Sequence, residues 1–154
     1  MKLFGWISDP KMALWVLILL SVWQFGSPML IFIAGLKQIP NSLYEAASLD
    51  GANWWQKFGR ITIPMISPVI FFNLIMQTIS GFMMFVPAYI ITRGGPFEKT
   101  MVYSLYMYLN GFKYFKMGYA SALAWILLLV LAIFTFIFFK TAPKWVYYET
   151  KGIF

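Results

Sequence analysis

The sequence predicts an all-α membrane protein with three transmembrane helices and a helix-turn-helix loop between the first two. Of the 154 residues, 61% are hydrophobic and only 11% are charged, whereas soluble domains carry about 25% charged residues. Asp, Glu, Lys and Arg are absent from positions 12–36, 61–92 and 117–139, which hold 25, 32 and 23 residues. Each stretch is long enough for a membrane-spanning helix, which needs about 20 residues.

The three expected spans cover residues 13–36, 66–92 and 118–139 within one membrane domain, 1–154. In the first span, we expect a kink at Pro28, because proline removes a helical hydrogen bond. In the second, Pro68 falls in the first turn, where helices favour proline. After the third span, an interfacial anchor is predicted from basic and aromatic residues: Lys144, Trp145, Tyr147, Tyr148 and Lys151.

The loop between the second and third spans opens with the sequence TRGGP at 92–96, a combination of residues that ends helices. Apolar residues then recur at the spacing of one helix face. The segment is too short to span, so we expect it to lie in the membrane interface with its tyrosines at headgroup level. The face consists of Met101, Val102, Leu105, Tyr106, Leu109 and Phe112.

The loop between the first two spans, 37–65, predicts a compact pair of helices. Ser42 and Glu45 have the spacing of a capping box, so a first helix should begin after Ser42. It should end at Asp50 and Gly51, because glycine adopts the left-handed conformation that ends helices. Asp50 could then accept N–H bonds from a second helix over 52–60.

The two faces of this loop differ in polarity. A simple hairpin between spans needs only a few residues, so about 30 ordered residues favour a docking role, although a passive structured connector stays an alternative. We expect Leu43, Ala46, Ala47, Trp54 and Phe58 to pack inward and Asp50, Gln56, Lys57 and Arg60 to face outward.

The residue inventory argues against an enzyme and against a bound cofactor or metal. The chain has no Cys and no His, which removes the commonest nucleophile, general base and metal ligands. Its five acidic residues are dispersed along the chain. No phosphate-binding G-x-x-x-x-G-K-[ST] sequence is present. The net charge of +7 comes from scattered basic residues, so nucleic acid is not an expected partner.

Uncharged polar residues are the candidates for a substrate pathway, because no charged residue lies inside any expected span. Asn73, Gln77 and Ser80 recur at i, i+4 and i+7, and Gln24 lies near the break in the first span. Such amides and hydroxyls suit a neutral, hydroxyl-rich solute. Hydrogen bonding between neighbouring helices is the alternative role. The small residues Gly118, Ala120, Ala122 and Ala124 favour close helix packing.

An ordered set of motifs resembles the permeases of bacterial ABC importers. Glu45-Ala46-Ala47, then Gly51, Ile61 and Ile63-Pro64 resemble their EAA motif, with Ile63 where leucine is usual. Further stretches are similar to the sugar-importing branch: Asp50-Gly51-Ala52 and positions 35–40, 92–96 and 118–122.

The resemblance implies the C-terminal half of a six-helix permease core in a bacterial inner membrane, with ATP and magnesium bound by a separate protein. Its expected partners are a cytoplasmic ATPase dimer, a second permease subunit, an extracytoplasmic solute-binding protein and membrane lipid. The loop 37–65 would be cytoplasmic and would couple ATPase closure to alternating access. The residues carried over for coupling are Glu45, Ala46, Ala47, Asp50, Gly51, Ile61 and Pro64.

Charge does not give the orientation, because the loops on the two sides would carry six Lys and Arg residues each. The cytoplasmic placement of the loop 37–65 and of the C-terminus is therefore implied by the resemblance alone. We also expect the chain to be a truncated permease that does not transport by itself. A membrane scaffold that docks a cytoplasmic partner is the alternative function, and a self-sufficient channel is a third.

Overall fold

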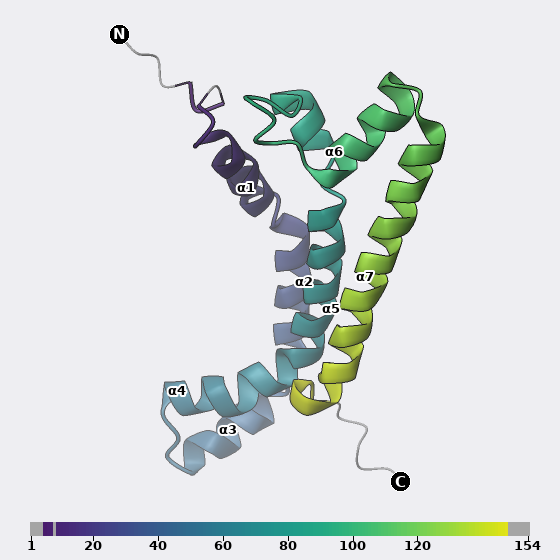
Figure 1. Ribbon diagram of the computed structural model, residues 1–154. Helices are drawn as coiled ribbons and strands as arrows, with labels where there is room; N and C mark the ends of the chain where they lie inside the picture. The colour runs from purple at the N-terminus through teal and green to yellow at the C-terminus, as the bar shows by residue number, and fades with distance from the viewer. Residues whose placement is uncertain (1–4, 8, 148–154) are drawn as a thin grey trace. The chain divides into compact units, whose positions relative to one another are not determined.

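The computed structural model describes residues 5–7 and 9–147, and within them every regular element is a helix (Figure 1). Three helical stretches are long and apolar enough to cross a membrane: Ala13–Lys37, Trp54–Phe82 and Met117–Trp145. The predicted all-α fold with three spans is therefore confirmed. Tyr148 and Lys151 of the expected C-terminal anchor lie outside the described residues.

The chain divides into two compact units. Unit 1 comprises Met1–Phe25 and Gln77–Ile133, and unit 2 comprises Gly26–Met76 and Phe134–Phe154. Along the sequence, the first change of unit coincides with an interruption of the first span. The helices α5 and α7 each contribute residues to both units.

The first span consists of α1 (Ala13–Trp23) and α2 (Gly26–Lys37), interrupted at Gln24 and Phe25. The disruption expected from Pro28 is present as an interruption one turn before the proline and not as a kink at the proline itself. Pro28 lies in the first turn of α2, where a residue needs no N–H because no carbonyl precedes it in the helix. The interruption falls four residues earlier than Pro28, at Gln24.

The second span is continuous with the loop that precedes it. The short helix α4 (Trp54–Lys57) runs through a π turn, η1 (Phe58–Thr62), into α5 (Ile63–Phe82). Pro68 therefore lies inside α5 and not in a first turn as expected. The expected span 66–92 is not one helix either, because α5 ends at Phe82 and a second π turn, η2 (Ala88–Thr92), follows Pro87.

Ser67 compensates for the proline inside α5. Pro68 has no N–H to donate to the carbonyl of Pro64, and the Ser67 hydroxyl donates to that carbonyl at 2.6 Å instead. The same hydroxyl accepts the backbone N–H of Tyr147 at 2.8 Å. Ser67 is only 3% exposed. One buried hydroxyl thus completes α5 and fastens the segment that follows α7 (Met117–Trp145) to it.

The core of unit 2 forms around the same junction. Phe71 is buried with Ala142 and Val146, and its ring lies 5.3 Å from that of Phe139 and 5.8 Å from that of Trp145. On the other side of α5, a Cβ at Gly35 would lie 2.7 Å from Cγ2 of Val69. Glycine at this position therefore allows α2 and α5 to touch.

The core of unit 1 is built by Leu17, Ala88 and Leu105, which are fully buried. Leu105 lies in α6 (Tyr103–Tyr108), so a helix forms where the spacing of apolar residues predicts one. The predicted face is only partly buried, since Phe112 at its end is 62% exposed. The π turn η3 (Leu109–Lys113) widens the helix there and rotates Phe112 off the face.

Other expectations for unit 1 are confirmed in part. The TRGGP segment does end a helical element, the π turn η2, with Arg93 and Gly94 at φ 50° and 84°. Small residues bring α7 close to its neighbour at Ala120, whose Cβ would lie 3.2 Å from a Cβ at Gly111. At Gly118 the expected close packing is absent among the described residues, because no atom lies within 4 Å of the Cβ position.

The double role of Ser67 predicts that Ser67→Ala destabilises the chain. The substitution removes the partner of the Pro64 carbonyl and of the Tyr147 N–H at a part-buried junction, and an unsatisfied group of this kind costs about 1–3 kcal/mol. Thermal unfolding in detergent should show a lower midpoint. Ser121→Ala is the matched control, because the exposed Ser121 hydroxyl bonds only to a carbonyl of its own helix. Equal midpoints for the two variants would contradict the role given to Ser67.

Candidate functional site: the loop between the first two spans

The first helix of the loop, α3 (Asn41–Leu49), ends where the sequence predicts. Asp50 is the C-terminal cap residue, and Gly51 follows with φ +74°. The N–H of Gly51 donates to the Ser48 carbonyl at 3.1 Å, and that of Ala52 to the Ala47 carbonyl at 2.9 Å. This pair of bonds is a Schellman motif, which satisfies the last carbonyls of α3 and reverses the chain.

The predicted caps are wrong at the start of both helices. Pro40 occupies the cap position of α3, so Ser42 is already the second helical residue and makes no capping bond. The second helix is capped by Asn53 and not by Asp50. The Asn53 side chain accepts the Gln56 N–H and the Gln56 side chain accepts the Asn53 N–H, both at 2.9 Å. A capping box therefore exists, but it lies eleven residues later than Ser42.

Side chains clamp α3 to the helix that follows it. The Tyr44 hydroxyl lies 2.8 Å from the Thr62 hydroxyl. The Lys57 ammonium donates to the Ser48 hydroxyl at 2.6 Å, and that hydroxyl donates to the Tyr44 carbonyl at 2.7 Å. We call residues 41–62 the elbow. One arm of the elbow is α3, and the other arm is α4 together with η1. Sequence reasoning missed these contacts, because no spacing rule joins residues nine or eighteen positions apart.

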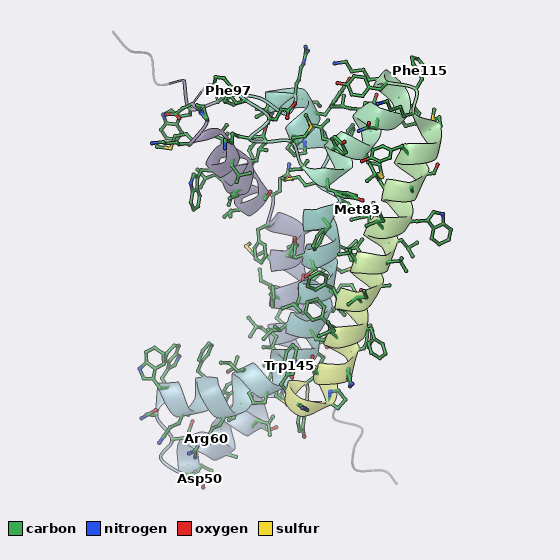
Figure 2. The ribbon with its side chains drawn as sticks, in the orientation of Figure 1. Asp50, Arg60, Met83, Phe97, Phe115 and Trp145 are labelled. Atoms are coloured by element: carbon green, nitrogen blue, oxygen red, sulfur yellow. The ribbon has the colours of Figure 1, made fainter. Side chains whose placement is uncertain are left out.

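A polar pocket of about 350 Å³ lies between the two arms of the elbow. Asp50 contributes a carboxylate to it and Lys57 and Arg60 contribute positive charge; Figure 2 shows Asp50 and Arg60 on the elbow. The full lining comprises Ala47, Asp50, Ala52, Gln56, Lys57, Arg60 and Ile61.

The expected division into inward and outward residues is wrong for the large side chains. Trp54 is 63% exposed and Phe58 is 40% exposed. Lys57, expected outside, is half-buried because its ammonium reaches Ser48. The short α3 covers only one side of α4, so the large aromatic rings on the opposite side stay uncovered.

The residues predicted for coupling all lie on or beside the elbow. Glu45, Ala46 and Asp50 are exposed on α3 or at its end. Ala47 and Ile61 are half-buried in the lining of the pocket. Gly51 makes the turn, and Pro64 lies at the second position of α5, where its carbonyl accepts the Ser67 hydroxyl. The structure thus places the coupling residues on the elbow or directly beside it.

The residues predicted for a substrate pathway are divided between the two units. Asn73 belongs to unit 2, is 4% exposed and donates its side-chain amide to the Val69 carbonyl of its own helix at 3.0 Å. Gln77 and Ser80 belong to unit 1 and are exposed, as is Gln24 at the interruption of the first span. Their assignment to a pathway stays a prediction.

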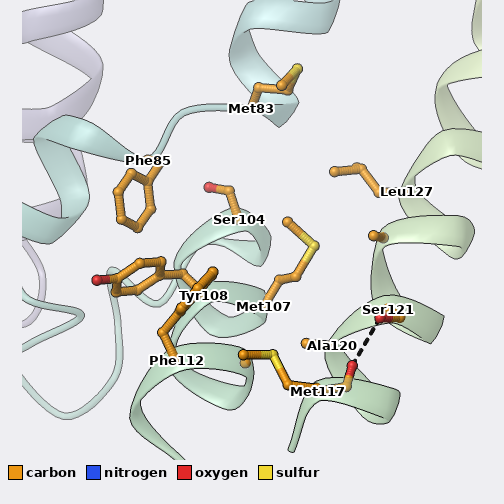
Figure 3. A pocket seen from close by; sticks show the side chains of 12 residues that line it. Met83, Phe85, Ser104, Met107, Tyr108, Phe112, Met117, Ala120, Ser121 and Leu127 are labelled. Atoms are coloured by element: carbon orange, nitrogen blue, oxygen red, sulfur yellow. Dashed lines mark hydrogen bonds between the residues drawn. The ribbon is translucent and has the colours of Figure 1, made fainter. Parts of the chain in front are cut away.

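Unit 1 contains an apolar pocket of about 410 Å³ that sequence reasoning missed (Figure 3). Its polar groups include the Ser104 and Ser121 hydroxyls, which donate to the Met84 and Met117 carbonyls. Repulsion from the neighbouring Tyr89 holds the pKa of Tyr108 above its usual value. The lining includes Met83, Phe85, Met107, Tyr108, Met117 and Leu127.

No group of three or more His, Cys, Asp or Glu side chains that could hold a metal ion occurs among the described residues. The candidate site is the elbow, which carries carboxylates, cations and exposed apolar side chains on one surface. Such a surface is suited to docking a partner.

Residues 1–145 match the family described as "Binding-protein-dependent transport system inner membrane component". The chain belongs to this family. The resemblance read from the EAA motif and its companions is thereby confirmed, and the chain is an integral membrane component of a transport system.

Individual relatives in this family carry related names. The "Probable ABC transporter permease protein YesP" of Bacillus subtilis is 60% identical over 95% of this chain and 48% of its own length. The lactose transport system permease protein LacF of Rhizobium radiobacter is 36% identical over 91% of this chain and 48% of its own length. The arabinooligosaccharides transport system permease protein AraP of Bacillus subtilis is 35% identical over 88% of this chain and 44% of its own length. The chain spans about half the length of these relatives.

The positive φ of Gly51 predicts opposite effects for two glycine substitutions in the elbow. A Cβ at Gly51 or at Gly59 would meet no atom within 4 Å, so only backbone conformation differs. Gly51→Ala forces alanine into the left-handed region, at about 1–2 kcal/mol. Gly59→Ala lies in the helical η1 turn and should be neutral or stabilising by about 0.5–1 kcal/mol. Hydrogen exchange at the Ala52 N–H should speed up by about tenfold only in Gly51→Ala; similar exchange in both variants would contradict this.

Proposed function

We propose that the chain acts as a permease subunit of an ATP-driven, binding-protein-dependent sugar importer, and that the elbow couples ATP hydrolysis to transport. The observation that carries the proposal is that every residue of the EAA-like motif lies on or beside one stiff, exposed element. The names of LacF and AraP, which specify lactose and arabinooligosaccharides, support a carbohydrate as substrate.

The contacts of the elbow explain how it could transmit movement. Its two arms are clamped through Tyr44–Thr62 and Ser48–Lys57, so α3 and α4 move together. Because α4 continues without interruption through η1 into α5, a displacement of α3 is carried into the second span. A flexible connector would absorb the same displacement in its own backbone.

On this proposal, the energy comes from partner proteins. A cytoplasmic ATPase dimer binds ATP and magnesium, a second permease subunit completes the membrane part, and an extracytoplasmic solute-binding protein delivers the sugar. The exposed carboxylates of Glu45 and Asp50 are suited to charge-assisted hydrogen bonds with basic groups of the ATPase.

The substrate pathway is proposed to use uncharged polar side chains of the spans, which are Gln24, Asn73, Gln77 and Ser80. Amides and hydroxyls can exchange hydrogen bonds with the hydroxyl groups of a sugar as it leaves water. The alternative is a scaffold that docks a cytoplasmic partner without transport, and this function does not require the four residues.

The cytoplasmic location of the elbow is tested by labelling single cysteines with a membrane-impermeant maleimide. The chain contains no cysteine, so Leu49→Cys and Phe97→Cys each provide one thiol. The two side chains are 90% and 84% exposed, and one span of the chain separates them. In intact cells position 97 should be labelled and position 49 should not, whereas permeabilised cells should label both. Labelling of position 49 in intact cells would place the elbow on the wrong side for an ATPase.

Docking of an ATPase through Glu45 predicts a selective effect of charge reversal. Glu45→Lys should weaken co-purification of the ATPase subunit by about tenfold. The substitution replaces a hydrogen-bond acceptor by a positive charge, which repels the basic groups of the ATPase. Glu98→Lys is the matched control, since Glu98 is also an exposed carboxylate but lies after the second span. Both variants should keep the thermal stability of the unmodified chain. If Glu45→Lys retains the ATPase as well as Glu98→Lys does, the carboxylate has no docking role.

A further inference from the structure

The elbow carries an exposed cluster of aromatic rings that its own packing does not use. Trp54 and Trp55 are 63% and 73% exposed, and Phe58 is 40% exposed. The rings contact one another: the Trp54 and Trp55 centroids lie 4.6 Å apart edge to face, and Phe58 stacks on Trp54 at 5.4 Å. We call these three residues the aromatic face of α4.

The aromatic face points away from α3. Gln56, Lys57 and Arg60 line the pocket that α4 and η1 share with α3, so they mark the side turned toward that helix. At about 100° per residue, the mean direction of Trp54, Trp55 and Phe58 lies nearly opposite to that side. The helix is therefore amphipathic, with one polar side turned toward α3 and one aromatic side turned away from it.

The arrangement of unit 2 directs this open side toward the membrane. In Figure 1, α3 and α4 run across the direction of α2 and α5, and α4 lies on the side of α3 from which α2 and α5 rise. When α5 crosses a bilayer, α4 consequently lies along its surface, with α3 farther from the lipid. The side of α4 opposite to α3 then faces the headgroups.

Residues at the C-terminal end of α7 indicate independently where the membrane surface lies. The Tyr147 N–H bonds to Ser67 near the start of α5, so this end of α7 lies at the same level as the start of the second span. Trp145 and Tyr147, 42% and 51% exposed, and the basic Lys144 occur there. Tryptophan, tyrosine and lysine are the residues that favour the membrane–water interface.

We propose that the aromatic face of α4 inserts into the headgroup region of the adjacent lipid leaflet and holds the elbow at a fixed height against the membrane. Indole rings combine a large apolar surface with an N–H donor, which matches the boundary between headgroups and acyl chains. Lys57 and Arg60 lie on the opposite side of the helix, toward α3, so the side that faces the lipid carries no charge from these two residues. The proposal applies to whichever leaflet the elbow faces and does not depend on the proposed sugar import.

Nitroxide labels on single cysteines test this contact in the full chain, reconstituted into vesicles of phosphatidylcholine and phosphatidylglycerol. Oxygen concentrates in lipid and a nickel chelate stays in water, so their relative collision rates report depth. Trp55→Cys should collide several-fold more with oxygen than with nickel. Leu49→Cys on α3 and Arg60→Cys on the polar side of α4 should show the reverse preference. Phe58→Cys gives a second position on the aromatic face, should Trp55→Cys not reconstitute.

Each other result would overturn the proposal. Nickel accessibility at position 55 equal to that at position 49 would mean that the face is in water. Protection from both reagents would mean that protein, such as a second copy of the chain, covers it. High nickel accessibility that falls only when the ATPase is added would make the face a docking site for that subunit. Failure of the ATPase to bind at all would count against the proposed function and would leave the depth measurement unaffected.

Discussion

The structure depends on how the backbone remains hydrogen-bonded where the elbow becomes a membrane helix. Two prolines, Pro64 and Pro68, fall at this entry, and each removes an N–H that the preceding turn would otherwise use. The π turn η1 directly precedes Pro64, and the Ser67 hydroxyl takes the place of the Pro68 N–H. Lipid offers no water to a free carbonyl, and the backbone stays helical from Trp54 to Phe82 although its direction changes between α4 and α5. Without the π turn and the Ser67 hydrogen bond the elbow would be a hinged appendage and not part of the second span.

The same junction joins the two ends of unit 2. The Ser67 hydroxyl also holds the Tyr147 N–H, and Phe71 one turn later packs against Ala142 and Val146. The C-terminal end of α7 and the start of α5 therefore respond to a displacement as one body. By contrast, the 18-residue apolar window of α7 is only 6% buried within the protein, against 22% for that of the second span. Most of the surface of α7 is thus offered to lipid or to neighbouring subunits, and its contacts are concentrated near its two ends, at Ala120 and Leu123 and at Ala142.

The sequence was sufficient for the fold class because charge is excluded from lipid so strongly that its absence alone marks the three spans. The sequence was also sufficient to predict the turn at Gly51, because the positive φ of that residue favours glycine over other residue types. It failed at the caps, because Ser42–Glu45 and Asn53–Gln56 both satisfy the same four-residue spacing and only the start at Pro40 excludes the first. It could not reveal the π turns or the Ser67 junction, since these arise from contacts between segments up to 80 residues apart. Of the candidate site, the motif was predictable by resemblance, and the Tyr44, Ser48 and Lys57 clamp that makes it stiff was not.

The two sides of the elbow have different chemistry, and this difference constrains how any partner can use it. α3 presents Glu45 and Asp50, which need water or a charged partner, while the far side of α4 presents Trp54 and Trp55, which do not. A partner that pushes on α3 meets an element clamped by Lys57 and Thr62, so the push cannot be dissipated by separating α3 from α4. With lipid against the aromatic face, movement along the membrane surface would encounter less resistance than movement into it, because driving Lys57 and Arg60 toward the hydrocarbon is unfavourable. The displacement passed to α5 would then be mainly a lateral tilt, which is the movement that opens one side of a helix bundle while closing the other.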